Sequence, residues 1–302
     1  MLSLAIHWNV DPAMFHIGSF GLRWYSFGFL LAFGLGYYIL SLIFKREKVR
    51  SEYLDALVVD IFLAVLIGAR LGHCLFYDFD YFFTAEHWTE IFWPFENGHF
   101  TGFSGLASHG AAIAIFITMW LYWRKYKMNV WWVFDRLVIV VALGGVFIRT
   151  GNLFNSEIYG TATDLPWGFI FERNGETVPK HPTGLYEATA YLIIFAVSLG
   201  YYLKKKGQFK PGTIFGWWLV ALFGARFLIE FVKTNGVIEG CPLLKGQLLS
   251  IPLILGGLVI AWMARHEKFP QTVFPHGEDK ALLAKWDEKK KEEERKKNAK
   301  KK

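Results

Sequence analysis

The hydrophobic residues of this 302-residue chain gather in blocks of about twenty, rather than alternating or forming one-sided stripes. A block of that length lets an α-helix cross ~30 Å of hydrocarbon at ~1.5 Å per residue. The pattern therefore predicts an all-α integral membrane protein with seven transmembrane helices. The expected helices cover residues 21–44, 54–77, 107–123, 133–150, 184–203, 213–233 and 246–265.

Lysine and arginine are distributed unevenly among the segments that follow these helices. The segments after the first, third, fifth and seventh helices hold 24 of them, whereas those after the second, fourth and sixth hold four. Because basic segments stay in the cytoplasm, we expect the N-terminus outside and the C-terminus in the cytoplasm. Residues 1–265 then form a seven-helix transmembrane catalytic domain with periplasmic loops. Residues 266–302 form a charged cytoplasmic tail, either a solvated helix or disordered.

Composition adds little to this picture. Hydrophobic residues make up 53% of the chain, and its formal net charge is +7. A basic chain can bind nucleic acid, but here the excess lies in short loops and one tail, so it indicates topology and no nucleic-acid partner is expected. Cys74 lies in an apolar span and Cys241 in a loop, which supports neither a disulfide framework nor a zinc cluster.

Charged residues inside the spans are the first sign of chemistry. A charge at the centre of a spanning helix costs at least ~2.5–3.5 kcal/mol, so each needs a partner, a wet cavity or a helix end. With the orientation above, four arginines lie toward the outer side. Only Arg136 lies toward the cytoplasmic end, where snorkelling of its side chain is a sufficient explanation. The four outer arginines are Arg23, Arg70, Arg149 and Arg226.

Polar residues from several other segments lie at a similar depth. They are His109, Glu157, His181, Tyr186, Glu187, Glu230 and Gln247. For any single one of them, an interfacial anchor or half of a structural ion pair is the favoured explanation, and Arg226 can simply be neutralised by Glu230, four residues later. Their convergence with four arginines favours an anionic ligand, since the guanidinium fork suits phosphate, and a phospholipid headgroup is the nearest abundant anion.

Six short segments, in the same order along the chain, carry a family likeness. They resemble the prolipoprotein diacylglyceryl transferases of bacteria over residues 15–265. The segments are GLRWY (21–25), GARLG (68–72), SHGA (108–111), RTGNLFNSEIYG (149–160), HPTGLYE (181–187) and RFLIEF (226–231).

The resemblance implies a multi-pass enzyme of the bacterial inner membrane. Such an enzyme transfers the diacylglyceryl group of phosphatidylglycerol to the lipobox cysteine thiol of a prolipoprotein signal peptide. The products are a thioether-linked lipid and glycerol phosphate. Its partners are phosphatidylglycerol, the prolipoprotein and bilayer lipid, and the resemblance implies neither a metal nor a soluble cofactor.

The resemblance also implies site residues, carried over motif by motif. The catalytic candidates are His109, Arg149 and Arg226. The substrate-binding candidates are Tyr25, Asn152, Glu157, Gly160, His181, Glu187 and Glu230. The chain departs from the family pattern at Ala111, Ile148, Gly184 and Leu222, which puts the shape of the lipid pocket in question more than the reaction.

The implied reaction sets two tasks. Charge that grows on the departing phosphate needs fixed positive groups, a task that we assign to Arg149 and Arg226. A thiol with an ordinary pKa near ~8.5 must also lose its proton. His109 is the preferred base, with His181 behind it, because histidine titrates in the right range. The alternative is that the field of the arginines lowers the thiol pKa and water accepts the proton.

A membrane transporter of a small anion or lipid is the main rival reading. It also needs arginines in the membrane, but it requires a polar path through both halves of the bilayer and often a repeated helix architecture. The inner half offers only Asp60 and the Asp135/Arg136 pair, and no repeat is visible. A metal enzyme is disfavoured because His109 and His181 lack a third obvious ligand.

Overall fold

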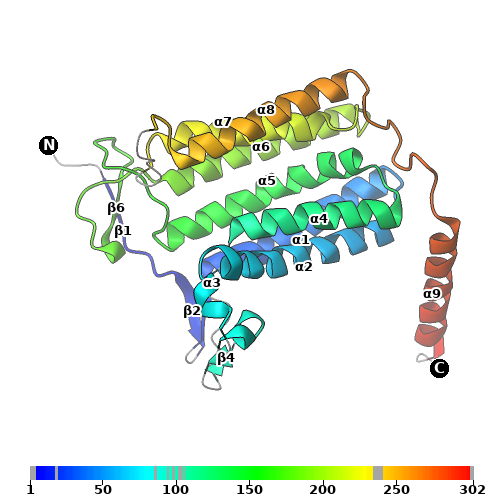
Figure 1. Ribbon diagram of the computed structural model, residues 1–302, viewed down its shortest axis with the longest axis horizontal. Helices are drawn as coiled ribbons and strands as arrows, with labels where there is room; N and C mark the ends of the chain where they lie inside the picture. The colour runs from blue at the N-terminus through cyan, green and yellow to red at the C-terminus, as the bar shows by residue number, and fades with distance from the viewer. Residues whose placement is uncertain are drawn as a thin grey trace. The chain divides into compact units, whose positions relative to one another are not determined.

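The structure, a computed structural model, describes residues 5–17, 20–84, 87–93, 95–96, 99–100, 105, 107–233 and 241–299. Within these residues a long helix occupies each of the seven expected positions (Figure 1). They are α1 (Trp24–Arg46), α2 (Ser51–Phe76), α4 (Ser108–Tyr126), α5 (Val130–Phe154), α6 (Thr183–Lys205), α7 (Thr213–Glu230) and α8 (Lys245–Arg265). Of these, α1, α5, α6, α7 and α8 are long and apolar enough to cross a membrane. The chain is therefore mostly helical and has the apolar helices of a multi-pass membrane protein.

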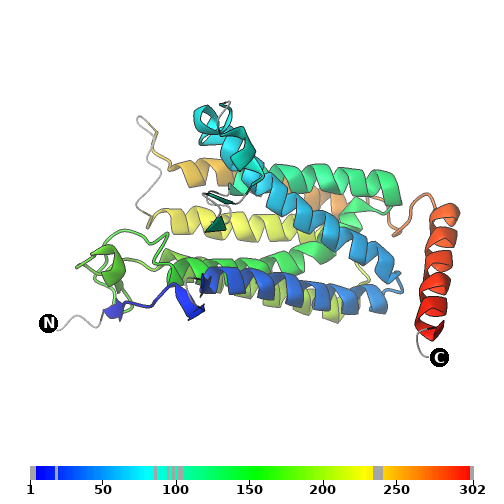
Figure 2. The ribbon, with the colours of Figure 1, turned by 90° about the horizontal axis from the view of Figure 1, so that it is seen from below.

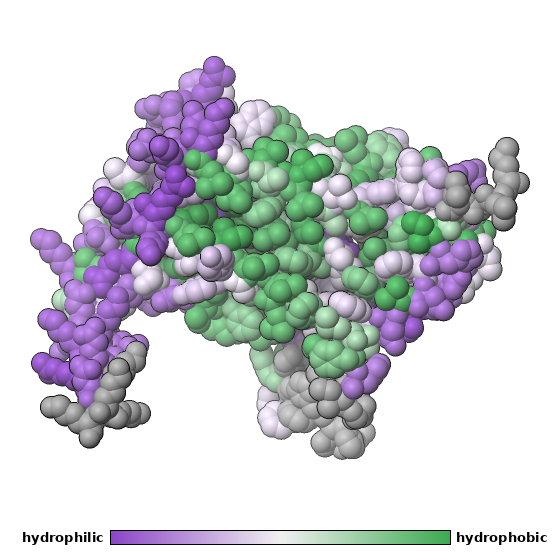
Figure 3. All heavy atoms as spheres, turned by 180° about the vertical axis from the view of Figure 1, so that it is seen from behind, coloured by the Kyte–Doolittle hydropathy of each residue, from purple (hydrophilic) through white to green (hydrophobic). Residues whose placement is uncertain are grey.

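Large apolar side chains stand on the outside of these helices. Leu30 on α1, Val197 on α6 and Leu228 on α7 are 66%, 65% and 67% exposed. Figure 3 shows hydrophobic side chains over a broad helical face. Contiguous apolar surface of this kind is costly in water and suits a hydrocarbon solvent.

The helices divide into two compact units, each described by itself. The first comprises residues 1–47 and 131–271, and the second residues 48–130 and 272–302. In the first unit, α7 lies between α6 and α8 (Figures 1 and 2). Its contact with α8 is close because both helices present glycine: a Cβ at Gly216 would lie 2.9 Å from the Gly257 carbonyl oxygen. Small residues at such contacts let helix backbones approach.

Two buried charges join the lysine-rich ends of α1, α5 and α7. Arg136 on α5 is 1% exposed, and its Nε and Nη2 donate to the two carboxylate oxygens of Glu47 at 3.0 and 2.7 Å. The neighbouring Asp135 accepts from the backbone N–H groups of Gly212 and Phe215, where α7 begins. The prediction that Arg136 snorkels to the membrane surface is therefore wrong, because a carboxylate contributed by the end of α1 neutralises it inside the protein.

In the second unit, α2 and α4 approach through glycines. A Cβ at Gly68 would lie 2.7 Å from the carbonyl oxygen of Gly110, and one at Gly72 would lie 2.5 Å from its Cα. Arg70 on the same helix donates to the carbonyls of Glu90 and Ile91, so it holds the segment after α2. That segment carries the short elements α3 (Phe79–Phe82), η1 (Trp88–Ile91), β4 (Phe95–Glu96) and β5 (His99–Phe100).

The charged tail forms a helix, α9 (Lys280–Ala299), as one of the two expected alternatives has it. The helix is not simply solvated. The Trp286 ring lies 4.9 Å from that of Tyr53 on α2 and 6.0 Å from that of Tyr126 on α4. Beside it, Arg50 pairs with Asp287 at 2.7 Å, which holds the pKa of that carboxyl below its usual value. The tail thus contacts the α2–α4 pair through specific side chains.

Short strands accompany the helices of the first unit at the end remote from the lysine-rich loops. β1 (Ile6–Trp8) pairs in parallel with β6 (Phe169–Phe171), and β2 (Ala13–Ile17) pairs antiparallel with β3 (Phe20–Arg23). The 3-10 helix η2 (Glu172–Asn174) follows β6. Hydrophobic periodicity gave no sign of these strands, because pieces of three to five residues are too short to carry an alternating pattern.

Candidate functional site

A buried carboxylate between two cations forms the centre of the candidate site. Arg149 near the end of α5 places its Nε 2.6 Å from Glu187 Oε2 on the first turns of α6. Lys233, just after α7, donates from Nζ to the other oxygen, Glu187 Oε1, at 2.7 Å. The Glu187 side chain is 0% exposed, whereas those of Arg149 and Lys233 keep 16% and 11%. Glu187 is therefore the buried counterion of two partly exposed cations.

Local sequence explains why α5 and α6 meet here. Gly184, one turn before Glu187, lies so close to α5 that a Cβ would be 3.3 Å from the Arg149 carbonyl oxygen. A longer side chain at this position would have to turn away from that contact. Glycine at 184, one of the departures from the family pattern, thus lets α6 pack directly against the backbone that carries Arg149.

A chain of amide and carboxylate contacts extends from Arg149 into the segment after α5. Arg149 Nη1 lies 3.4 Å from the acceptor Asn152 Oδ1, and Asn152 Nδ2 donates to Glu157 Oε2 at 3.2 Å. Asn155 Nδ2 donates to the other Glu157 oxygen at 3.1 Å. The signature segment 149–157 is therefore a single hydrogen-bonded unit. Tyr25 of α1 packs against the same turn, since a Cβ at Gly151 would lie 3.0 Å from its ring.

Gly160 lies where three segments meet. Its N–H donates to the carbonyl of His181 at 2.8 Å, and the next N–H, of Thr161, donates to the carbonyl of Val232 at 2.8 Å. A Cβ at Gly160 would collide with that Val232 oxygen, so only glycine fits. His181 itself lies 3.1 Å from the Tyr186 hydroxyl through Nδ1. These contacts tie the start of α6 and the end of α7 to the signature segment.

Arg226 and Glu230 do not form the ion pair that their spacing allows. Glu230 has its ionic contact with Lys233, at 3.5 Å from Nζ, and its carboxylate lies against the backbone of Gly246. The half-buried Arg226 has no ion-pair partner among the residues that the structure describes. Arg226 and Arg149 both lie within electrostatic range of the buried Tyr191 of α6.

His109 belongs to the second unit. It is the second residue of α4, has an exposed side chain, and precedes Gly110 at the close contact with α2. The start of a helix at this histidine is confirmed. Its approach to the Arg149 cluster stays a prediction.

Two site residues were not found from the sequence. Lys233 was counted only as a loop charge, although its position three residues after Glu230 is a helical ion-pair spacing. Tyr191 lies four residues after Glu187, and only its place on the same helical face could have indicated it. Within the described ranges no three histidine, cysteine or acidic side chains gather as a metal site would require.

The fold and the cluster together define a class of protein: a helical membrane protein with fixed cations at the ends of several apolar helices, suited to an anionic group. A sequence model of the prolipoprotein diacylglyceryl transferase family matches residues 12–263. The chain belongs to this family.

Curated relatives cover nearly the same region. A phosphatidylglycerol–prolipoprotein diacylglyceryl transferase of Tolumonas auensis is 39% identical over 266 residues, covering 87% of this chain and 99% of the relative. Proteins of the same name from Bacteroides fragilis and Chloroherpeton thalassium are 39% and 38% identical. They cover 85% and 86% of this chain, and 94% of each relative.

Proposed function

We propose that this protein transfers the diacylglyceryl group of phosphatidylglycerol to the lipobox cysteine thiol of prolipoproteins, with glycerol phosphate as the second product. The observation that carries the proposal is the Arg149–Glu187–Lys233 cluster, built on the family's signature segment in a chain that matches the transferases over most of its length. The rival transporter reading has no comparable support.

The proposed location is the bacterial inner membrane, with seven spans, the N-terminus outside and the tail in the cytoplasm. The two helices α2 and α4 then also cross the bilayer, in addition to the five that are apolar enough by composition. In this orientation the Arg149 cluster faces the outer side. The lysine-rich loop after α6 and the tail face the cytoplasm, as the charge distribution favours.

The reaction is a displacement at carbon. A sulfur–carbon bond forms to the glyceryl CH₂, the carbon–oxygen bond to phosphate breaks, and the leaving glycerol phosphate takes the electron pair. Arg149 and Arg226 stabilise the negative charge that grows on that phosphate, since fixed guanidinium groups in a partly dry site need no reorganisation. Glu187 is a positioning residue: it holds Arg149 by Nε and leaves the outer edge of the guanidinium toward the substrate.

The thiol proton goes to His109, the preferred base, or to water if the cation field alone lowers the thiol pKa. Asn152, Glu157 and Tyr25 line the approach to Arg149 and hydrogen-bond the lipid headgroup or the peptide. Gly160, His181 and Glu230 contribute by joining the segments that surround the cluster.

The test is a transfer assay with purified protein, phosphatidylglycerol and a lipobox peptide, read as the diacylglyceryl mass on cysteine. A peptide with serine in place of cysteine is the negative control. We expect Arg149→Lys and Arg226→Lys each to lower turnover at least about a hundredfold, because lysine lacks the bidentate fork. Arg46→Lys, at an exposed residue at the end of α1, is the matched control and stays active.

Folded protein that makes no product, but moves phosphate esters across a vesicle membrane, would favour the transporter instead. Near-full turnover of both arginine variants would remove the phosphate assignment while leaving the transferase in place. For the base, the pH–rate profile of His109→Gln decides: loss of the acidic limb supports His109, and an unchanged limb removes His109 as the base.

A further inference from the structure

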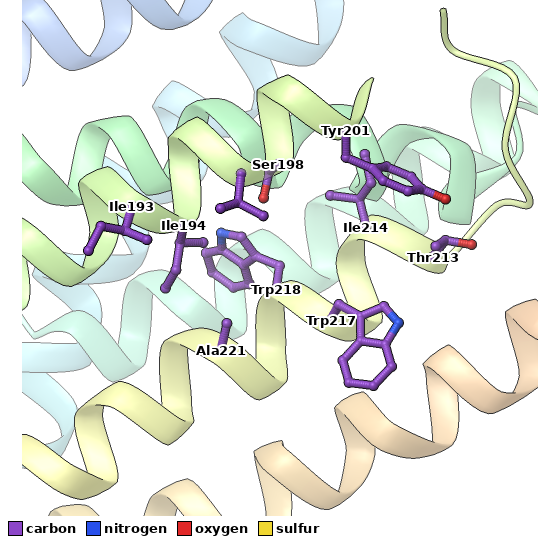
Figure 4. Close-up of a pocket in the computed structure, with 10 residues that line it drawn as sticks. Ile193, Ile194, Ser198, Tyr201, Thr213, Ile214, Trp217, Trp218 and Ala221 are labelled. Atoms are coloured by element: carbon purple, nitrogen blue, oxygen red, sulfur yellow. The ribbon is translucent and has the colours of Figure 1, made fainter. Parts of the chain in front are cut away.

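A groove of about 420 Å³ lies between α6 and α7, at the end of the bundle away from Arg149 (Figure 4). One part of it is apolar and is lined by Ile193, Ile194 and Ala221. It opens on the outer surface of the bundle, since Val197 and Trp217 on its rim are 65% and 58% exposed. In a membrane this surface contacts acyl chains.

The other part of the groove is polar. Figure 4 places Tyr201 and Thr213 together where α6 passes into α7, with the Trp218 ring between the two helices deeper in the groove. The indole Nε1 of Trp218 is buried and has no hydrogen-bond acceptor among the residues that the structure describes. A buried N–H without an acceptor is costly, so a ligand that supplies one is favoured.

The depth of Trp218 suits a lipid ester. It lies five residues into α7, about 7.5 Å along the axis from Thr213. The interfacial layer of a bilayer is about 5–7 Å thick on each side, so Trp218 lies near the level where acyl chains begin. Ester carbonyls occur at this level, and they are acceptors without a donor of their own.

Positive charge lies beside the polar end. Lys204, Lys205 and Lys206, which we call the basic turn, are exposed where α6 ends, and none has an ion-pair partner among the described residues. The next lysine, Lys210, differs because it binds the Arg265 carbonyl and Glu267. A turn of three unpaired lysines at a membrane surface attracts an anionic headgroup.

From this order of apolar wall, buried donor and unpaired lysines we propose that the groove binds one anionic phospholipid of the bilayer. An acyl chain lies along α6 and α7, an ester carbonyl accepts from Trp218 Nε1, and the phosphate lies at the basic turn. The polar end of the groove is separate from the Arg149 cluster, because Tyr201 and Glu187 are 14 residues apart on α6, about 21 Å along the helix. This lipid is a resident of the opposite leaflet and not the substrate.

Native mass spectrometry of the detergent-purified full chain tests the proposal, with dioleoyl phosphatidic acid and dioleoyl phosphatidylcholine as probes. We expect the protein to bind one equivalent of phosphatidic acid tightly, and to bind phosphatidylcholine at least about fivefold more weakly. The Arg149→Gln variant should still bind this equivalent of phosphatidic acid. Ala221→Trp fills the groove and removes this equivalent. Val197→Trp blocks the same groove from the α6 side, and this variant is used in place of Ala221→Trp if Ala221→Trp does not fold. Leu255→Trp, at an exposed residue on α8 outside the groove, keeps the equivalent.

Two further variants test the polar contacts. The triple change K204Q/K205Q/K206Q weakens phosphatidic acid binding at least about fivefold but leaves phosphatidylcholine unchanged. Trp218→Phe, which keeps the ring and removes the donor, weakens both lipids about threefold or more. The proposal is overturned if the groove-filling variants retain phosphatidic acid as well as the unaltered protein does, or if the unaltered protein binds the two lipids equally. Loss of the equivalent in Arg149→Gln would assign it to the reaction site and also overturns it.

Discussion

At the scale of single residues, Lys233 is the cation to substitute first, because it both contacts Glu187 and adds a positive charge to the candidate site. It lies 2.7 Å from Glu187, which also holds Arg149. In Lys233→Met, Arg149 is the one cationic partner of Glu187 left among the described residues, and the site loses one positive charge. A charge-assisted hydrogen bond is worth about 1.5–3 kcal/mol, so we expect kcat/KM in the transfer assay to fall about tenfold to a hundredfold.

The conservative change provides the control. Lys233→Arg keeps the charge near Glu187 and restores most of kcat/KM. If Lys233 helps to bind the phosphate, Lys233→Met raises KM for phosphatidylglycerol more than it lowers kcat. A merely structural role predicts a lower melting temperature with unchanged kinetic constants in the folded fraction, and that result would exclude the assignment.

The sequence could indicate most of these residues but not their partners. Arg149, Asn152 and Glu157 lie within nine residues, so one motif contained a unit that the structure links by hydrogen bonds. The contact between Glu187 and Lys233 joins positions 46 residues apart, one on α6 and the other just after α7. Helical spacing can suggest Glu230 for Lys233 but says nothing about such a distant partner.

At the scale of secondary-structure elements, the pair Glu47–Arg136 joins the end of α1 to α5. The Arg136 side chain is 2% exposed, and Glu47 has its carboxylate within 2.7 Å. Glu47→Ala removes the carboxylate that is hydrogen-bonded to this buried guanidinium and leaves the longer contact with Asp135, at 3.8 Å. Breaking a buried ion pair in this way destabilises a protein by about 3–5 kcal/mol. We expect a large fall in the thermal unfolding temperature in detergent. Glu292→Ala, which breaks an exposed pair with Lys296 on α9, serves as control and changes stability by less than about 0.5 kcal/mol.

The glycine contact between α2 and α4 gives a second prediction for the elements. In Gly110→Ala the new Cβ would collide with the backbone of Gly68 and Gly72, so the helices must separate. Such overpacking costs about 1–3 kcal/mol, and because His109 is the adjacent residue we also expect slower transfer. Circular-dichroism melting and the transfer assay measure both effects. Gly34→Ala on α1 has no neighbour within 4 Å and leaves both unchanged; equal behaviour of the two variants would contradict the contact.

Helices were predictable because twenty apolar residues in a membrane leave the backbone few alternatives. The predicted 133–150 helix continues as α5 to Phe154, and that extra turn carries Gly151 and Asn152 beyond the apolar block. A helix boundary predicted from hydropathy falls at the first polar residue, whereas the helix itself continues as long as its backbone hydrogen bonds are satisfied. The short strands beyond it depend on pairing between distant segments, such as Ile6 with Phe169, which no local pattern encodes.

At the scale of the whole molecule, the charged tail lies outside the family match. The family match ends at residue 263, whereas α9 begins at Lys280 and contacts α2 and α4 through Trp286. The charge of this tail could be read from its composition, but its specific contact could not, because one tryptophan in a run of lysines gives no periodic signal.

These contacts make a prediction that separates the tail from the chemistry. Trp286→Ala removes the ring that packs against Tyr53 and Tyr126, so α9 detaches and a nonspecific protease cleaves it about tenfold faster or more. Lys289→Ala, at an exposed residue of the same helix, leaves the cleavage rate unchanged. Because the candidate site residues all lie within the family match, we expect transfer by Trp286→Ala to stay within about twofold of the unaltered protein. A parallel loss of activity would mean instead that α9 supports the reactive end through the α2–α4 pair, and slow cleavage with full activity would show that Trp286 does not hold the tail.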